Sequence, residues 1–386
     1  MYMWKPKSIQ LVIKLTKLCN LRCKYCYEYP YLGDKRKIEL TDIEKMFQNI
    51  LPSVVEHSIS KVEFVFHGGE PFLLSASYYR SIFEMQQRIF GQAGILFQNV
   101  VQTNLINLKP EHVQLIKDDV ISGVGVSIDL FGEERVNQSG KSMDHRTLAN
   151  MDILAKENIF VSVISVLSGK TAPFYKEMFA FFDKCNTTWR LLPIDLTGYE
   201  GQHDDNLLTA VKLVKILKDL FDQWIQSESA IKFEPINEYM DIAISFLNSN
   251  ETLHKFSKET DDSLFIINTN GQVFCEADAY NDLFAYGNIF TTPFSALLSS
   301  SARKRAIERA NLITGSVCND CMYYGHCSGF RMAESTTEKL YWDVNGNISC
   351  TVIKPMVDYI VEKLTFDNTF PLSKGSLSTD KQLAVL

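Results

Sequence analysis

The sequence has no run of about 18 apolar residues that could cross a bilayer. Its first seven residues, Met1 to Lys7, also lack the apolar stretch of a signal peptide. We therefore expect a cytoplasmic protein with no membrane partner. Basic residues are also fewer than acidic ones, and the net charge is −7. Because phosphate binding favours a basic surface, this charge argues against nucleic acid as the main partner.

The chain is long enough, at 386 residues, for one large domain and a smaller one, and its 46% hydrophobic content supports a substantial core. It contains nine cysteines. Without an export signal these are better interpreted as metal ligands than as disulfides, because cytosolic thiols stay reduced. Cys185 has no partner at ligand spacing, so we expect it to be a small buried hydrophobic residue.

Three cysteines near the N-terminus, Cys19, Cys23 and Cys26, are separated by three residues and then by two. They follow a predicted strand over 8–16. Three thiolates can ligate three irons of a cubane cluster and leave the fourth iron open for an exogenous ligand. Four thiolates would instead make an electron carrier or a structural zinc site. Spacing alone also fits a zinc half-site or buried thiols.

A second motif, His67-Gly68-Gly69-Glu70-Pro71, follows a short β-rich run over 61–66. Its glycines fall at the end of a strand, where the backbone must turn tightly. Together the two motifs resemble those of the radical SAM enzymes, whose hallmark is this cysteine spacing with an aromatic residue, here Tyr25, before the third cysteine. The resemblance implies a [4Fe-4S] cluster on the three cysteines that binds S-adenosylmethionine at its open iron. It also implies that Gly68, Gly69 and Glu70 receive the methionine amino group.

Helical and strand-like patterns alternate along the first half of the chain. Strands are predicted over 8–16, 62–66, 95–103, 123–128, 159–167 and 188–192, and helices over 41–55, 76–90, 109–117, 144–157 and 172–182. Such alternation predicts an α/β fold with a parallel sheet and helices outside. In radical SAM enzymes this is an open six-unit (β/α) barrel. Ligands of such sheets bind at the C-terminal ends of the strands.

Polar residues end the third and fourth predicted strands, in Gln102-Thr103-Asn104 and Ser127-Ile128-Asp129. By resemblance these positions line the pockets for the adenosine and the methionine carboxylate, with Thr103 and Ser127 as contacts. Ordinary turn chemistry would also place such residues there. Arg190 is expected to end the sixth strand, where it would pair with a carboxylate or form a structural salt bridge.

A polar stretch over 198–206 predicts a loop that leaves the barrel. Apolar residues at helical spacing then predict a helix over 207–224 and a shorter one over 237–246. We expect four parts in the chain. They are a radical SAM barrel over 1–200, a helical bridge over 201–262, a second module over 263–364 and a flexible tail over 365–386.

The second module opens with a predicted β-hairpin over 264–275, because an Asn-Gly pair separates two apolar runs. Four more cysteines follow, and their spacing fits zinc and [4Fe-4S] about equally: Cys318, Cys321, Cys327 and Cys350. Together with the hairpin and Tyr286-Gly287-Asn288-Ile289, they resemble the SPASM domain of peptide- and protein-modifying radical SAM enzymes. The resemblance implies that the four cysteines hold an auxiliary [4Fe-4S] cluster.

The sequence departs from the fuller SPASM pattern in two places. Arg331 replaces a further cysteine, and no cysteine lies between Cys185 and Cys275. We therefore expect one auxiliary cluster, and Cys275 lacks the partners for another. Glu276 occupies the place of an Asp that is proposed to deprotonate the substrate in sulfatase-maturing relatives, so it is our candidate catalytic base. A solvent-facing hairpin acid is the alternative, and Asp278 is a weaker candidate for the base.

Further stretches, Gly125 to Asn137 and Tyr323 to Gly329, resemble maturases of ribosomal peptide natural products, most closely those that form three-residue cyclophanes. The resemblance implies a 5'-deoxyadenosyl radical that abstracts a side-chain hydrogen from a precursor peptide, followed by oxidative C–C cross-linking. Partners would be that peptide and an electron donor such as flavodoxin or ferredoxin. The alternative is an anaerobic sulfatase-maturing enzyme that makes formylglycine. The Gly-Gly-Glu-Pro segment argues against a simple electron-transfer protein.

Overall fold

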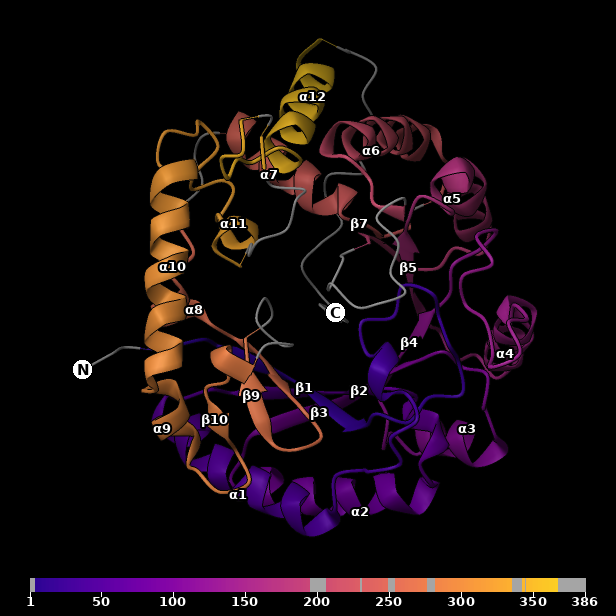
Figure 1. The fold of residues 1–386 in the computed structure, drawn as a ribbon, viewed down its shortest axis with the longest axis vertical. Coiled ribbons are helices and arrows are strands. Elements are labelled where there is room, and N and C mark those ends of the chain that lie inside the picture. Colours follow the sequence, from indigo (N-terminus) through magenta and orange to yellow (C-terminus); the bar gives the residue numbers. More distant parts are fainter. Residues whose placement is uncertain are drawn as a thin grey trace.

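The computed structural model describes residues 4–194, 206–229, 231–248, 254–275, 282–334, 342–343 and 345–366. Within these residues one sheet of ten strands has the order β10-β9-β8-β1-β2-β3-β4-β5-β6-β7. Figure 1 shows the helices arranged around the outside of these strands. None of the helices in the described ranges is long and apolar enough to cross a membrane.

The six predicted strands pair in parallel with their neighbours along the chain, which confirms the α/β class. They are β1 (Ser8–Thr16), β2 (Lys61–Gly68), β3 (Leu96–Thr103), β4 (Gly123–Ser127), β5 (Ser162–Leu167) and β6 (Trp189–Pro193). The intervening helices are α1 (Leu40–Glu56), α2 (Ala76–Gln86), α3 (Pro110–Lys117), α4 (Asp144–Lys156) and α5 (Tyr175–Lys184). A two-residue strand, β7 (Phe233–Glu234), extends the sheet in parallel beyond β6.

Alternate residues of the strands face opposite sides of the sheet. On β1, Leu11 and Ile13 pack into the large core shared with α1 and α2. Val12 faces the other side and packs against Val65 of β2 and Val100 of β3. By the same alternation Lys14 belongs to this inner side. The barrel interior is therefore apolar in its middle and becomes polar toward the C-terminal ends of the strands.

The C-terminal half continues the same sheet. Strand β8 (Leu264–Ile267) pairs in parallel with β1, and β9 (Gln272–Phe274) completes the predicted hairpin by pairing antiparallel with β8. Strand β10 (Gly287–Asn288) follows. The helices of this half are α6 (Ala210–Gln226), α7 (Ile236–Asn248), α8 (Lys258–Asp261), α9 (Phe294–Leu298), α10 (Ser301–Val317), α11 (Phe330–Glu334) and α12 (Ile353–Phe366). The boundaries proposed for the four parts of the chain stay predictions.

The expectation of a buried Cys185 is wrong. This cysteine is exposed and directly follows the last residue of α5. It lies just past the end of the helix, and a helix end projects into solvent more often than a helix middle. Most of the tail predicted over 365–386, from residue 367 on, lies outside the described residues.

Candidate active site

The three N-terminal cysteines lie on one loop, residues 17–39 between β1 and α1, which we call the cysteine loop. Cys19 and Cys23 are buried, and Cys26 is half-buried. Burial, together with the nearby Glu70 and Cys23, raises the pKa of Cys19 to about 12. Burial also raises the pKa of Cys26, as do Cys23 and Cys19. A metal that binds these thiols would have to displace their protons.

Four further cysteines surround a single cavity, whose wall they share with Tyr324 and Met332. They are Cys318, at the end of α10, with Cys321, Cys327 and Cys350. Burial and the other three thiols raise the pKa of Cys318 to about 12. Gly329 closes one side: a Cβ there would lie 2.9 Å from the Tyr324 ring and 3.5 Å from the sulfur of Cys318. The structure thus brings together the four residues that the sequence grouped.

Both cysteine sets fit iron–sulfur clusters better than single metal ions. Among the described residues, no three His, Cys, Asp or Glu side chains converge as the ligands of one ion would. Each thiolate of a cubane cluster binds a different iron, so its ligands stand further apart than those around one zinc. Both sets offer only soft sulfur ligands, which suit iron–sulfur chemistry and do not suit Mg²⁺ or Ca²⁺.

Gly68 and Gly69 allow the cysteine loop to lie directly on the end of β2. A Cβ at Gly68, whose φ is +127°, would lie 2.1 Å from the carbonyl oxygen of Thr16, and one at Gly69 would lie 2.3 Å from that of Leu18. The Gly69 N–H donates to Thr16 and the Glu70 N–H donates to Leu18, each at 2.8 Å. Any side chain at these glycines would push the loop off the strand.

We therefore expect Gly69→Ala to lower the free energy of unfolding by about 1–3 kcal/mol, the usual cost of forcing extra atoms into a packed site, and to reduce iron content. Denaturant unfolding of the metal-free protein and iron analysis would measure both. Gly33→Ala in the same loop is the control, because no atom lies within 4 Å of its added Cβ. Equal effects of the two substitutions would show that close packing at Gly69 is unimportant.

Glu70 ties the end of β2 to the end of β3. Its carboxylate is fully buried and accepts hydrogen bonds from the Thr103 hydroxyl at 2.6 Å and from the backbone N–H groups of Phe72 and Asn104, both at 2.8 Å. Burial raises the pKa of Glu70, while these bonds act in the opposite direction. The contacts of Glu70 and Thr103 with S-adenosylmethionine stay predictions, and the structure adds that the two side chains bond to each other.

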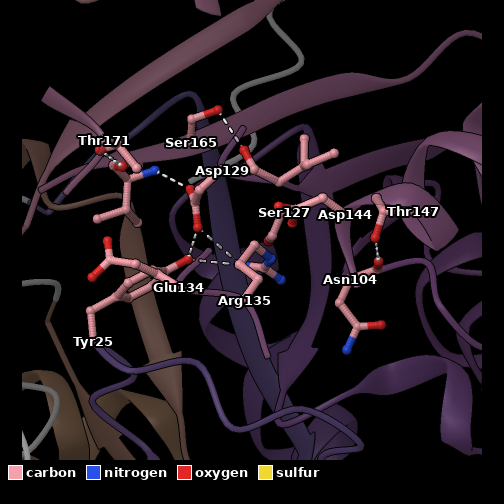
Figure 2. A network of polar contacts seen from close by, with 12 residues as sticks. Tyr25, Asn104, Ser127, Asp129, Glu134, Arg135, Asp144, Thr147, Ser165 and Thr171 are labelled. Carbon is pink, nitrogen blue, oxygen red and sulfur yellow. Dashed lines mark hydrogen bonds and ion pairs between the residues drawn. The ribbon is translucent and has the colours of Figure 1, made fainter. Parts of the chain in front are cut away.

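Tyr25 extends from the cysteine loop into a buried polar network (Figure 2). Its hydroxyl donates to Asp129, which follows β4, and accepts from Arg135 at 2.9 Å. Asp129 also accepts the backbone N–H of Val166 at 2.6 Å. Burial raises the pKa of Asp129 to about 6, although Arg135 lowers it. The ionic contact between Arg135 and Asp129 measures 3.8 Å.

The segment after β4 also holds the cysteine loop through its backbone. The Arg22 N–H donates to the Val136 carbonyl at 2.7 Å, and the Lys24 N–H donates to the Glu134 carbonyl at 3.0 Å. The buried Glu134 side chain accepts from Ser168 and, at 2.7 Å, from Asn206. The loop is thus fixed by β2 on one side and by this segment on the other. Sequence reasoning gave no role to Arg135 or Glu134 individually.

Ser127, at the end of β4, accepts a hydrogen bond of 2.7 Å from Gln102 of β3. The two predicted polar positions therefore meet at the C-terminal ends of these neighbouring strands. The expectation that Arg190 ends the sixth strand is wrong. Arg190 is the second residue of β6, half-buried, between Ile164 of β5 and Glu234 of β7 in the register. The strand continues through Leu191 and Leu192 to Pro193, one residue beyond the end predicted at 192. The contacts of Ser127 and Arg190 with a cofactor stay predictions.

Cys275 is 1% exposed and lies beside a network of buried charges. Lys258 of α8 contacts Asp262 at 3.1 Å and Glu334 of α11 at 2.6 Å. Arg303 of α10 lies 3.7 Å from Asp262 and donates to the carbonyl groups of Lys258 and Glu259. We call Lys258, Asp262, Arg303 and Glu334 the buried ion network. The predicted base, Glu276, and Asp278 lie outside the described residues.

Comparisons with known proteins agree with this geometry. Residues 13–179 match the model of the radical SAM superfamily. A cysteine-type anaerobic sulfatase-maturating enzyme of Clostridium novyi (strain NT) is 25% identical over 373 residues, which cover 93% of this chain and 97% of the relative. A serine-type anaerobic sulfatase-maturating enzyme of Bacteroides thetaiotaomicron is 21% identical over 350 residues, covering 84% of this chain and 82% of the relative.

Solved structures share the fold. Native anSMEcpe with bound AdoMet and the Cp18Cys peptide superposes with a TM-score of 0.73 at 19% identity, over 93% of this chain and 98% of that one. Streptococcus suis SuiB bound to S-adenosylmethionine gives a TM-score of 0.57 at 14% identity, over 84% and 72%. The match over residues 13–179 is to the radical SAM superfamily, and the cysteine loop at the end of β1 and the parallel sheet agree with it.

Proposed function

We propose that this chain is a radical SAM peptide maturase that cross-links two side chains of a ribosomally made precursor peptide. The observation that carries the proposal is the pair of separate cysteine sets. Three cysteines lie on the loop after β1, where a parallel sheet binds its ligands, and four others surround a cavity of their own. The first set suits a cluster with an open iron, and the second suits a fully ligated cluster.

The cluster on Cys19, Cys23 and Cys26 would supply one electron to S-adenosylmethionine, which yields methionine and a 5'-deoxyadenosyl radical. The chain itself holds the loop in place. Tyr25 is bonded to Asp129 and Arg135, and Glu70 joins β2 to β3 beneath the loop. Such rigid support keeps reacting groups within the small tolerance that radical transfer requires.

Loss of a pair of hydrogens from a peptide requires an acceptor for the second electron. In this proposal the cluster at Cys318, Cys321, Cys327 and Cys350 is that acceptor. A carboxylate near the substrate would take the accompanying proton, and Glu276 remains our candidate.

Formylglycine formation in a sulfatase is a second candidate, because the full-length relatives from Clostridium novyi and Bacteroides thetaiotaomicron are named as sulfatase-maturating enzymes. The number of cysteines favours cross-linking. The sulfatase-maturing pattern carries ligands for two auxiliary clusters. In this chain Cys275 is the cysteine left over after one auxiliary cluster, and it lies beside Lys258 and Tyr286. Arg331 also stands in place of one ligand cysteine.

Mass spectrometry of a short peptide encoded beside this gene tests the proposal, after anaerobic incubation with the enzyme, reductant and S-adenosylmethionine. Cross-linking predicts loss of a pair of hydrogens and no backbone fragments between the linked residues. An unchanged peptide together with formylglycine in a sulfatase peptide would favour the second candidate. No 5'-deoxyadenosine in any mixture would contradict the radical SAM chemistry itself.

Cys321→Ala should separate the roles of the two cysteine sets. We expect iron to fall from about eight to about four atoms per chain, because one of two four-iron clusters loses a ligand. Formation of 5'-deoxyadenosine should continue, while cross-linked peptide should be lost. Iron analysis and chromatography of the same reaction would measure all three quantities. Loss of 5'-deoxyadenosine together with the product would contradict a separate role for the auxiliary site.

A further inference from the structure

Basic charge is concentrated on the cysteine loop. Residues 17–39 contain six basic and three acidic residues, a net charge of +3, although the whole chain carries −7. The other residues together therefore carry −10. A cationic surface on an acidic protein attracts a partner of opposite charge.

The three acidic residues of the loop neutralise its basic charge only in part. Glu28 is 3% exposed and forms an ion pair of 2.5 Å with the buried Lys14. Asp34 pairs with Arg36 at 2.6 Å and offsets its charge, and Glu39 is exposed. The exposed basic residues of the loop are Lys24, Lys35, Arg36 and Lys37.

Aromatic rings lie among these charges. Tyr29 and Tyr31 are 44% and 43% exposed. They belong to a short helical turn, Tyr29–Tyr31, which begins three residues after Cys26. The ammonium of Lys17 lies 4.0 Å from the centre of the Tyr31 ring, which fixes the ring at the surface. Exposed tyrosines surrounded by charge are typical of protein–protein interfaces.

We propose that this outer face of the cysteine loop is the docking surface for an acidic one-electron donor protein, of the low-potential flavin or iron–sulfur class. The inference rests on the proposed function and names the partner that it requires. The donor gives one electron to the cluster on the loop and is itself oxidised by one electron, and no proton or bond is exchanged at the interface.

An electron donor fits this surface better than the substrate peptide does. The surface belongs to the loop that carries the cluster ligands, and its exposed Lys24 is the residue next to Cys23 in the chain. Electron transfer slows steeply with distance and needs no opening into the barrel. A substrate peptide must instead reach the C-terminal ends of the strands, where Gln102 and Ser127 lie.

Charge reversal tests the proposal. Lys35→Glu combined with Lys37→Glu removes two exposed ammonium groups without touching a cysteine. Lys304→Glu combined with Arg305→Glu makes the same change of net charge on α10, where both residues are exposed. Each enzyme is assayed for 5'-deoxyadenosine with a reduced flavodoxin and, separately, with dithionite. Titration calorimetry measures binding of oxidised flavodoxin to each variant.

At low ionic strength we expect the loop variant to lose about 10-fold or more of its flavodoxin-driven rate and to bind flavodoxin correspondingly more weakly. Its dithionite-driven rate should match the wild type, and salt should reduce the difference. The α10 variant should behave as the wild type with both reductants.

An unchanged flavodoxin-driven rate and affinity in the loop variant would overturn the docking surface, as would an equal loss in the α10 variant. A slower peptide modification with dithionite, at normal cleavage of S-adenosylmethionine, would identify the surface as a peptide site and also overturn it. Failure of the proposed function looks different, because dithionite would then give no 5'-deoxyadenosine with any enzyme. The calorimetric comparison still decides the docking surface in that case.

Discussion

Cys26→Ala should abolish reductive cleavage of S-adenosylmethionine, with a fall in 5'-deoxyadenosine formation of at least about 1,000-fold, or roughly 4 kcal/mol in activation free energy. The loop offers only three thiols, so the loss of one leaves a cluster with too few protein ligands. The iron content should fall to about half, because the four cysteines around the cavity, which would hold the auxiliary cluster, are untouched.

The control is Cys185→Ala. This cysteine is exposed at the end of α5, and neither cysteine set includes it. We expect it to keep wild-type iron and activity, so that a general loss of thiols cannot account for the effect at Cys26. Substantial 5'-deoxyadenosine from the Cys26 variant, or a full complement of iron in it, would contradict the assignment of the three-cysteine site.

Lys258→Met should destabilise the protein by about 3–5 kcal/mol, the typical cost of breaking a buried ion pair by removing one partner. The side chain of Lys258 is 1% exposed. Although burial acts against its charge, Asp262, Cys275 and Glu334 raise its pKa well above the usual range. Methionine fills a similar volume, so the effect would report Glu334 left buried without its cation and Asp262 left with Arg303 alone, at 3.7 Å.

Denaturant unfolding of the metal-free protein would measure this change. Lys156→Met is the matched control, because Lys156 forms an ion pair of 2.5 Å with Asp152 on α4 in which both side chains are more than 60% exposed. Exposed pairs contribute about 0–1 kcal/mol, so we expect almost no effect there. Adding Glu334→Gln to Lys258→Met should recover part of the lost stability. Equal stability of the Lys258 and Lys156 variants would show that the buried ion network contributes nothing.

The sequence patterns located the six main strands and both cysteine sets, because these signals are local. A strand such as Ser8–Thr16 is marked by its own residues, and so are ligands spaced within one loop. Contacts between distant segments have no such signal. Tyr25 meets Asp129 across 104 positions, and Glu70 meets Thr103 across 33, so neither bond follows from composition or spacing.

Two other features could not be predicted from the sequence, one because the strand is short and the other because its pairing depends on the rest of the sheet. Strand β7 has only two residues, too few to show an alternation. The hairpin after Leu264 was expected from its Asn-Gly turn, but the turn does not indicate which strand will pair with it. Its parallel pairing with β1 depends on the shape of the whole sheet.

That pairing also sets the order in which the protein can be completed during synthesis. Gln10 of β1 faces Leu264 of β8, 254 positions later in the chain. At ribosomal rates of about 5–20 residues per second, β1 waits roughly 10–50 s for its second neighbour. During that time one side of an apolar strand remains an open edge, and an open edge readily pairs with other chains. The strand that leads into the cysteine loop thus gains its second neighbour only when most of the chain has been made.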